Sequence, residues 1–213
     1  MLYNIAKKCF YNVETIRIMN ETKISKKSLV SEVLEKMSML TEEVRAAKQA
    51  SVESNLLSFA NFLEAEHVLL YIQRSSELPT EKVIRTSLDV RKGIVLPAYS
   101  ESRHSITLLR INNYDSDIIK TDSDIFEPNP NMCKKIPLDM IDVALIPGLA
   151  FDEKGGRVGF GDGFYNKLIT KLPETTRKIA IAFEEQLVEH IPMESRKYNL
   201  DIIITDKRTI FKI

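Results

Sequence analysis

The chain has 213 residues, of which 44% are hydrophobic and 28% charged, a composition typical of one large or two small globular domains. The 30 lysines and arginines balance the 30 aspartates and glutamates, and this net charge of +0 lacks the positive excess of a strongly basic nucleic-acid-binding protein. Two cysteines are too few for a disulfide framework or a zinc site. No apolar run approaches the roughly 20 residues of a membrane span. From the balanced charge and the missing apolar run, we expect neither nucleic acid nor a membrane as partner.

The first 23 residues lack the continuous apolar segment of a secretory signal. Their few basic residues suit an organelle-targeting presequence, but Glu14 and Glu21 argue against one. We therefore expect an N-terminal extension over residues 1–23, one domain over residues 24–213 and a cytoplasmic location, with organelle targeting as the open alternative.

Helical periodicity begins at Ser25, after which leucine, valine and methionine recur every three or four residues. Thr41 is suited to begin a second helix, with two glutamates in its first turn, and we expect this helix to run to Leu63. A third helix is predicted over Thr80–Lys92, with Gly93 in the position that commonly ends a helix.

Short apolar runs without polar alternation predict buried strands. Helical segments separate them, at 164–172 and 184–191 in the second half, and a polar excursion is expected over residues 112–137. This alternation predicts the α/β class, a single three-layer domain with a mainly parallel sheet flanked by helices. The expected strands are His67–Ile72, Ile94–Ala98, Ser105–Ile111, Asp142–Pro147, Lys178–Phe183 and Asp201–Thr205.

Glycine is concentrated in one place, since five of the 7 glycines lie between Gly155 and Gly163. This cluster follows a predicted strand, and ligands of open α/β sheets bind at the carboxyl ends of the strands. Glycines let the backbone approach a ligand, and successive N–H groups suit an anion such as phosphate. The spacing fits neither a P-loop nor the dinucleotide fingerprint. A phosphate- or nucleotide-binding loop and a purely structural turn both remain open at this point.

The segment Pro147–Asn166 reads PGLAFDEKGGRVGFGDGFYN. It resembles the signature of the 5-formyltetrahydrofolate cyclo-ligase (5,10-methenyltetrahydrofolate synthetase) family, whose usual form is P-G-L-A-F-D-x-x-G-x-R-L-G-R-G-G-G-Y-Y-D. Shorter matches occur in the family's order, so the resemblance covers residues 25–210. They are Lys26–Leu29, Glu77–Thr80, Lys92–Pro97, Glu127–Pro128 and Asp201–Thr205.

This resemblance implies an enzyme that converts ATP and 5-formyltetrahydrofolate to 5,10-methenyltetrahydrofolate, ADP and phosphate, with Mg²⁺. The formyl oxygen would attack the γ-phosphate, N10 would then close the five-membered ring, and phosphate would leave. Such a protein mainly positions its reactants and stabilises charge on the transferred phosphoryl group. The implied partners are these small molecules, and we expect a monomer.

The matching positions imply roles for particular residues. Arg157 and Tyr165 are the expected catalytic residues, and Asn166 and Asp201 the expected Mg²⁺ ligands. The expected nucleotide-binding residues are Lys26, Lys27, Arg157, Gly159, Gly161 and Gly163. The expected folate-binding residues are Glu77, Phe160, Gly161, Asp162, Gly163 and Phe164.

Four positions depart from the family pattern. Val30 and Phe160 stand where the family has arginines, Asp162 is acidic, and Asn166 replaces an aspartate. Asp162 is therefore a candidate for the metal-binding role of that aspartate, and restoring an arginine at position 160 is predicted to raise activity or ATP affinity. Lys27, Lys154 and Lys167 are the candidates to supply the positive charge that these departures remove.

The same departures keep two other functions open. One is a non-catalytic homologue that binds a folate or a nucleotide. The other is a kinase-like or transferase activity on a different small acid.

Overall fold

The structure is a computed structural model that describes residues 26–74, 76–100, 105–121, 125–161, 163–193, 195 and 198–212. The expected extension over residues 1–23 and the candidate site residue Asp162 lie outside these residues.

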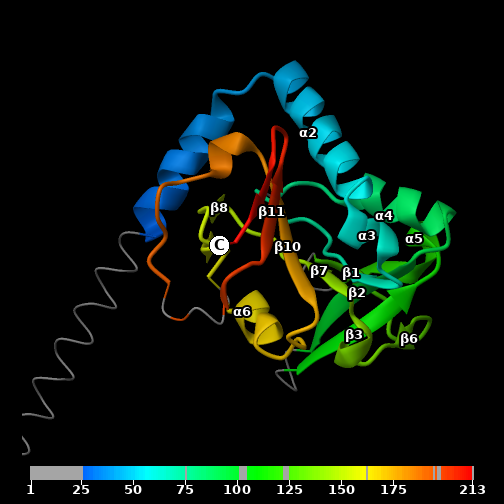
Figure 1. The fold of residues 1–213 in the computed structure, drawn as a ribbon. Coiled ribbons are helices and arrows are strands. Elements are labelled where there is room, and N and C mark those ends of the chain that lie inside the picture. The colour runs from blue at the N-terminus through cyan, green and yellow to red at the C-terminus, as the bar shows by residue number, and fades with distance from the viewer. Residues whose placement is uncertain are drawn as a thin grey trace, which may run out of the picture.

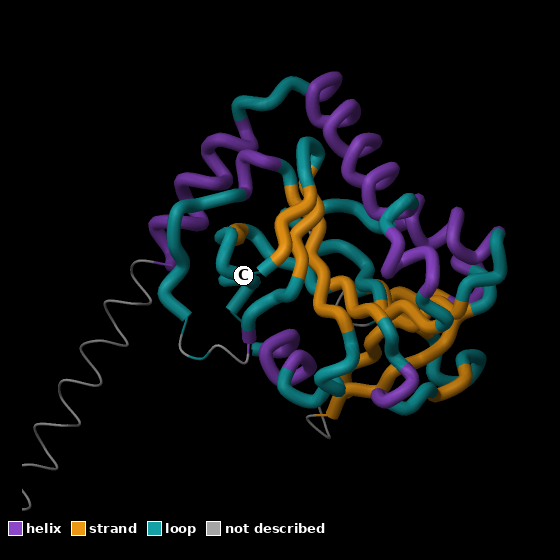
Figure 2. Tube along the Cα trace, in the orientation of Figure 1, coloured by secondary structure: helices purple, strands orange, loops and turns teal. Residues whose placement is uncertain are grey.

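Within the described residues, eight strands form one sheet in the order β12-β11-β10-β7-β1-β2-β3-β6 (Figures 1 and 2). The five strands from β11 to β2 run parallel, and β12, β3 and β6 add antiparallel edges. The prediction of a mainly parallel sheet is therefore confirmed. The strands are β1 (His67–Leu69), β2 (Gly93–Ser100), β3 (Ser105–Ile111), β6 (Lys134–Lys135), β7 (Val143–Leu145), β10 (Arg177–Ala182), β11 (Ile202–Thr205) and β12 (Thr209–Phe211).

Helices cover both faces of this sheet (Figure 1). The helices α2, α3 and α4 lie on one face, and α6 packs on the other. The described helices are residues 26–38, α2 (Glu42–Leu57), α3 (Ala60–Glu64), α4 (Glu81–Asp89), α5 (Tyr114–Asp117) and α6 (Phe164–Ile169), with short 3₁₀ turns at Leu138–Met140 and Glu184–Gln186.

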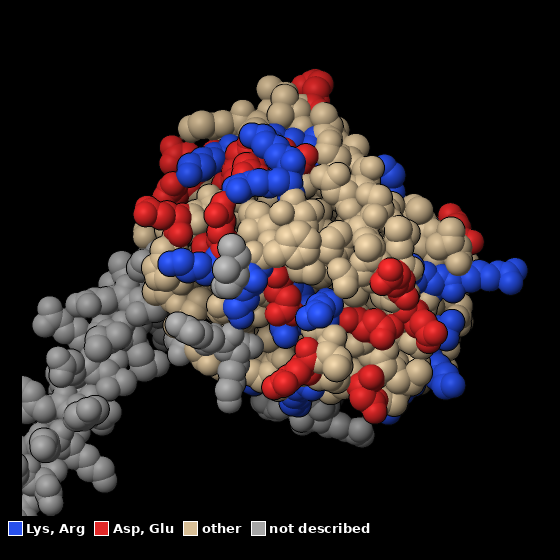
Figure 3. Space-filling model, viewed as in Figure 1, with Lys and Arg blue, Asp and Glu red and all other residues tan. Residues whose placement is uncertain are grey.

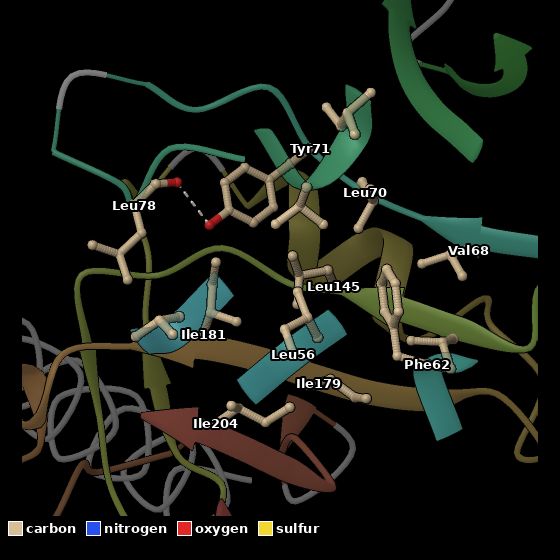
Figure 4. Close-up of a cluster of buried hydrophobic side chains, with 14 of the residues drawn as sticks. Leu56, Phe62, Val68, Leu70, Tyr71, Leu78, Leu145, Ile179, Ile181 and Ile204 are labelled. Carbon is tan, nitrogen blue, oxygen red and sulfur yellow. Dashed lines mark hydrogen bonds between the residues drawn. The ribbon is translucent and has the colours of Figure 1, made fainter. Parts of the chain in front are cut away.

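Side-chain alternation along the strands builds two separate cores. In β7, Val143 and Leu145 face the core under α2–α4, while Ala144 faces the core under α6. In β10, Ile179 faces the first core in the same way (Figure 4). A sheet buried on both faces explains why these strands show no polar alternation in the sequence. The three-layer prediction is confirmed.

The second predicted helix is interrupted. It ends at Leu57, and α3 begins only at Ala60. The cause is Ser58, whose N–H and Oγ both donate to the carbonyl of Ser54, after which Phe59 is extended. Such competition of a serine side chain for the backbone is typical of helix ends.

The predicted helix over residues 184–191 is wrong beyond its first turn. Only Glu184–Gln186 forms a 3₁₀ turn. The N–H of Phe183, just before the turn, donates to the side-chain oxygen of Gln186. The N–H of Val188 then donates to the carbonyl of Phe151, which draws the chain into an extended path. A long-range partner thus overrides the local helical pattern.

The polar excursion over residues 112–137 contains more structure than expected. Helix α5 is followed by a hairpin of β4 (Ile118–Lys120) and β5 (Phe126–Pro128), which forms a two-stranded sheet of its own. A second small hairpin pairs β8 (Ala150–Phe151) with β9 (Arg157–Val158) directly after β7. Both hairpins border the site described below.

Gly93 does not end the third helix, contrary to the prediction. Helix α4 ends at Asp89, and the left-handed residue that follows is Arg91, with a φ of 59°. Gly93 begins β2, where a Cβ atom would lie 2.5 Å from the carbonyl oxygen of Glu66. The glycine is thus required by close contact between two backbone segments.

Replacing Gly93 by alanine is expected to lower the free energy of unfolding by about 1–3 kcal/mol, because backbone atoms must shift to admit the methyl group. Urea denaturation measures this change. The matched control is Arg91→Gly, which removes a side chain from a left-handed position and should not destabilise the protein. An unchanged midpoint for Gly93→Ala would contradict the steric argument.

Charges on the face in Figure 3 are interspersed, with lysine and arginine beside aspartate and glutamate. That face carries no broad single-sign patch of the kind that attracts nucleic acid. No helix in the described part of the chain is long and apolar enough to cross a membrane.

Candidate functional site

The site lies at the carboxyl ends of β1 and β7, next to each other in the sheet. After β7, residues 146–149 lead into the β8–β9 hairpin, and the glycine-rich loop follows β9. After β1, residues 70–80 lead to α4. Chain segments that leave parallel strands at the same edge commonly form ligand sites in α/β proteins.

A pocket of about 210 Å³ opens between these segments. It is lined from the helix at residues 26–38, the segment after β1, the glycine-rich loop and α6, which are far apart in the sequence. Most of the site residues predicted from the sequence meet here. They are Lys26, Glu77, Arg157, Gly159, Phe160, Gly161, Gly163, Tyr165 and Asn166.

Arg157 is buried at the base of this pocket, with only 8% of its surface exposed. Its Nη1 donates to the carbonyl oxygen of Pro147, and its Nη2 donates to Oδ1 of Asn166, each at 2.6 Å. The planar guanidinium therefore connects the end of β7 to α6. Gly159 is needed beside it, because a Cβ atom there would lie 2.5 Å from Nη1 of Arg157.

Gly161 and Gly163 have the left-handed φ values of 91° and 71°, which L side chains rarely adopt. An added Cβ atom at either position would meet no other atom within 4 Å. These two glycines are therefore not required by protein packing. They give the loop its path and leave its backbone bordering open space in the pocket.

The opposite wall comes from residues 71–74 and 76–80, which several hydrogen bonds connect. The hydroxyl of Tyr71 donates to the carbonyl of Leu78 at 3.1 Å (Figure 4), and the hydroxyl of Thr80 donates to the carbonyl of Tyr71. Burial raises the pKa of Tyr71 well above its usual range, and the negative charge of Glu77 adds to this. Tyr71 thus remains a neutral donor that fixes this wall.

Glu77 is buried in this wall. Its N–H donates to the carbonyl of Arg74, and its Oε2 accepts from the N–H of Arg74, both at 2.9 Å. A carboxylate held in this way is oriented before any ligand binds.

A smaller pocket of about 40 Å³, lined by apolar side chains together with Arg74 and Glu127, adjoins the first one. Phe164, predicted to contact the folate, lines it together with Ile125 and Phe126 at the β4–β5 hairpin. Phe164 packs edge-on against Tyr165 with 4.9 Å between ring centroids. Tyr165 and Arg74 line both pockets, so these side chains form their common wall.

Two predicted residues are not brought to this site. Lys27 is exposed and does not line the pocket, although its neighbour Lys26 does. Asp201 lies at the amino end of β11, where its Oδ2 accepts from the N–H of Lys178 and pairs with Nζ of the same lysine at 3.3 Å. Asp201 does not line the pocket, and a joint role with Asn166 in binding a metal stays a prediction.

The described residues form no metal site made of protein ligands alone, and the binding of Mg²⁺ stays a prediction. Among these residues, no group of three or more His, Cys, Asp and Glu side chains is placed to hold a metal ion. Asn166 directs its Oδ1 to Arg157, and a magnesium site normally uses one or two carboxylates.

Arg74 and Val158 line the pocket although the sequence did not indicate them, and Arg74 is the charged one of the two. The lysines proposed to replace the missing arginines do not line the pocket, and Lys154 lines a different cavity, beside Asp152. Arg74 follows β1 and precedes Glu77 by three residues. Its place at the carboxyl end of a parallel strand is the signal by which it could have been found.

The fold and this pocket are typical of α/β proteins whose ligand site lies between a glycine-rich loop and the carboxyl ends of parallel strands. The chain belongs to the 5-formyltetrahydrofolate cyclo-ligase family, whose model matches residues 22–206. The predictions of this family and of an enzyme are confirmed. Membership in this family supports 5-formyltetrahydrofolate cyclo-ligase activity.

Individual relatives agree with this assignment. The chain is 26% identical to the probable 5-formyltetrahydrofolate cyclo-ligase of Caenorhabditis elegans over 183 residues, covering 80% of this chain and 87% of that one. It is 28% identical to the 5-formyltetrahydrofolate cyclo-ligase of Haemophilus influenzae over 148 residues, covering 68% and 79%. The NMR structure of Aquifex aeolicus 5,10-methenyltetrahydrofolate synthetase superposes with a TM-score of 0.76 and 27% identity, covering 88% and 92%.

Proposed function

We propose that this protein converts 5-formyltetrahydrofolate and ATP to 5,10-methenyltetrahydrofolate, ADP and phosphate. The observation that carries the proposal is the single pocket that unites Lys26, Glu77, Arg157 and Tyr165 with the glycine-rich loop. These residues come from separate segments, and a purely structural loop would not require them to line the same pocket.

The proposed reaction has two steps. The formyl oxygen on N5 forms a bond to the γ-phosphorus of ATP, and ADP leaves. N10 then attacks the formyl carbon and loses its proton, the bond between this carbon and the phosphate oxygen breaks, and phosphate leaves. The protein's task is to align the reactants and to stabilise negative charge on the phosphoryl group.

The pocket supplies groups for this task. The ammonium group of Lys26 and the backbone of Gly161 and Gly163 suit phosphate oxygens. The oriented carboxylate of Glu77 suits the N–H groups of the folate ring, and the rings of Phe126 and Phe164 in the smaller pocket suit the flat parts of a ligand. Arg157 positions the loop and Asn166 through its hydrogen bonds to Pro147 and Asn166. The participation of Mg²⁺, the monomeric state and the cytoplasmic location stay predictions.

An absorbance assay tests the proposal directly. Purified protein with 5-formyltetrahydrofolate and MgATP is expected to produce the near-ultraviolet absorbance of methenyltetrahydrofolate, with one ADP released per ring closed. Mixtures without ATP or without folate are the controls. If no absorbance develops at high protein concentration, the proposed reaction is wrong, and equilibrium binding of ATP and of folate then tests the non-catalytic alternative.

A further inference from the structure

Two guanidinium groups line the pocket, and their surroundings differ. Arg157 is buried, and both of its Nη atoms donate to protein oxygens, those of Pro147 and Asn166. Arg74 is only half-buried and lines both the larger and the smaller pocket, the latter together with Glu127. Arg157 thus shapes the site, whereas Arg74 is positioned to contact what enters either pocket.

Hydrogen bonds hold the backbone of Arg74 on both of its polar groups. Its N–H and its carbonyl are both bonded to Glu77, and the hydrogen bonds of Tyr71 and Thr80 close the wider turn. A side chain carried by such a turn loses less conformational freedom on binding than one on a mobile loop.

The guanidinium group of Arg74 also contacts the glycine-rich loop. Its Cζ lies 5.9 Å from the ring centroid of Phe160, within the range of a cation–π interaction. The Phe160 side chain is 42% exposed, so its ring is available as a platform at the mouth of the pocket. This contact places a positive charge beside the loop although the loop residue itself is apolar.

We propose that Arg74 is a substrate-binding residue that holds an oxyanion of the ligand, a phosphate or a carboxylate, against the glycine-rich loop, with Phe160 as its platform. The inference rests on the proposed function for the identity of the ligands, ATP and 5-formyltetrahydrofolate. The planar fork of a guanidinium matches two oxygens of either group.

Equilibrium binding to Arg74→Met tests this, with ATP and 5-formyltetrahydrofolate titrated separately. One of the two is expected to bind about 10- to 100-fold more weakly, as for a lost charged hydrogen bond. Weaker ATP binding identifies a phosphate, and weaker folate binding a carboxylate. Arg74→Lys should lie between wild type and Arg74→Met, and thermal unfolding should show that the variants remain folded. The matched control is Arg177→Met, an exposed arginine at the amino end of β10, which should bind both ligands as wild type does.

A second substitution sharpens the test. Phe160→Arg alone should give no gain in affinity, because it places a second positive charge beside Arg74 and removes the ring. In the Arg74→Met background, the same change should recover most of the lost affinity. This differs from the expectation drawn from the sequence, that Phe160→Arg by itself raises activity or ATP affinity, and the single variant decides between the two.

Binding of both ligands by Arg74→Met within twofold of wild type would overturn the inference. So would a wild-type protein that binds neither ligand. If wild type binds its ligands and Arg74→Met binds more weakly, but no ring closure occurs, the proposed function fails while the role of Arg74 stands.

Discussion

Replacing Arg157 by methionine is expected to slow ring closure about 100-fold or more. The two hydrogen bonds from its guanidinium, to Pro147 and to Asn166, hold the end of β7, the glycine-rich loop and α6 in one arrangement. A displacement of about 1 Å in such a framework can cost a factor of about 10² in rate. The measurement is kcat/KM in the absorbance assay, accompanied by the Kd for ATP.

Arg157→Lys separates geometry from charge. A lysine ammonium keeps the charge but cannot span both oxygens in the planar geometry of a guanidinium, so most of the loss should remain. Arg177→Met, at the opposite end of the parallel strands, should retain the wild-type rate. Near-normal rates in both Arg157 variants would show that these hydrogen bonds do not maintain the site.

Replacing Asp152 by alanine is expected to lower the free energy of unfolding by about 3–5 kcal/mol. The carboxylate is 1% exposed and accepts from the N–H groups of Lys154, Gly156 and Ile191 at 2.7–3.0 Å. It thereby joins the tip of the β8–β9 hairpin to a segment near residue 191. Each buried N–H left without its acceptor costs about 1–3 kcal/mol. Urea denaturation measures the loss as a lower midpoint.

The neighbouring residue Glu153 is the control. It is exposed and pairs with Arg208 at 2.8 Å, and an exposed ion pair contributes about 1 kcal/mol or less. Asp152→Asn retains one acceptor oxygen and should be intermediate. Equal losses from Asp152→Ala and Glu153→Ala would refute the view that the buried carboxylate organises this hairpin.

The sequence alone predicted the elements that depend on local pattern. The run Ser105–Ile111 is β3 as predicted, and the predicted run Lys178–Phe183 differs from β10 by one residue at each end. Continuous apolar runs predicted a sheet buried on both faces because a strand exposed to water on one face would alternate. The cluster of glycines and the family signature placed the site after β7.

Only the tertiary structure decided which side chains meet. Asp201 and Asn166 are both expected Mg²⁺ ligands, yet Asn166 lines the pocket, whereas Asp201, just before β11, accepts a hydrogen bond from Lys178. Arg157 and Asn166 are nine residues apart, and their hydrogen bond depends on how the glycine-rich loop turns between them. Arg74 and Phe160 are brought together because β1 and β7 are neighbours. Sequence patterns report on neighbours along the chain, whereas these contacts follow from strand order and direction, so the sequence determined the family and the layers, and the fold determined the working contacts of the pocket.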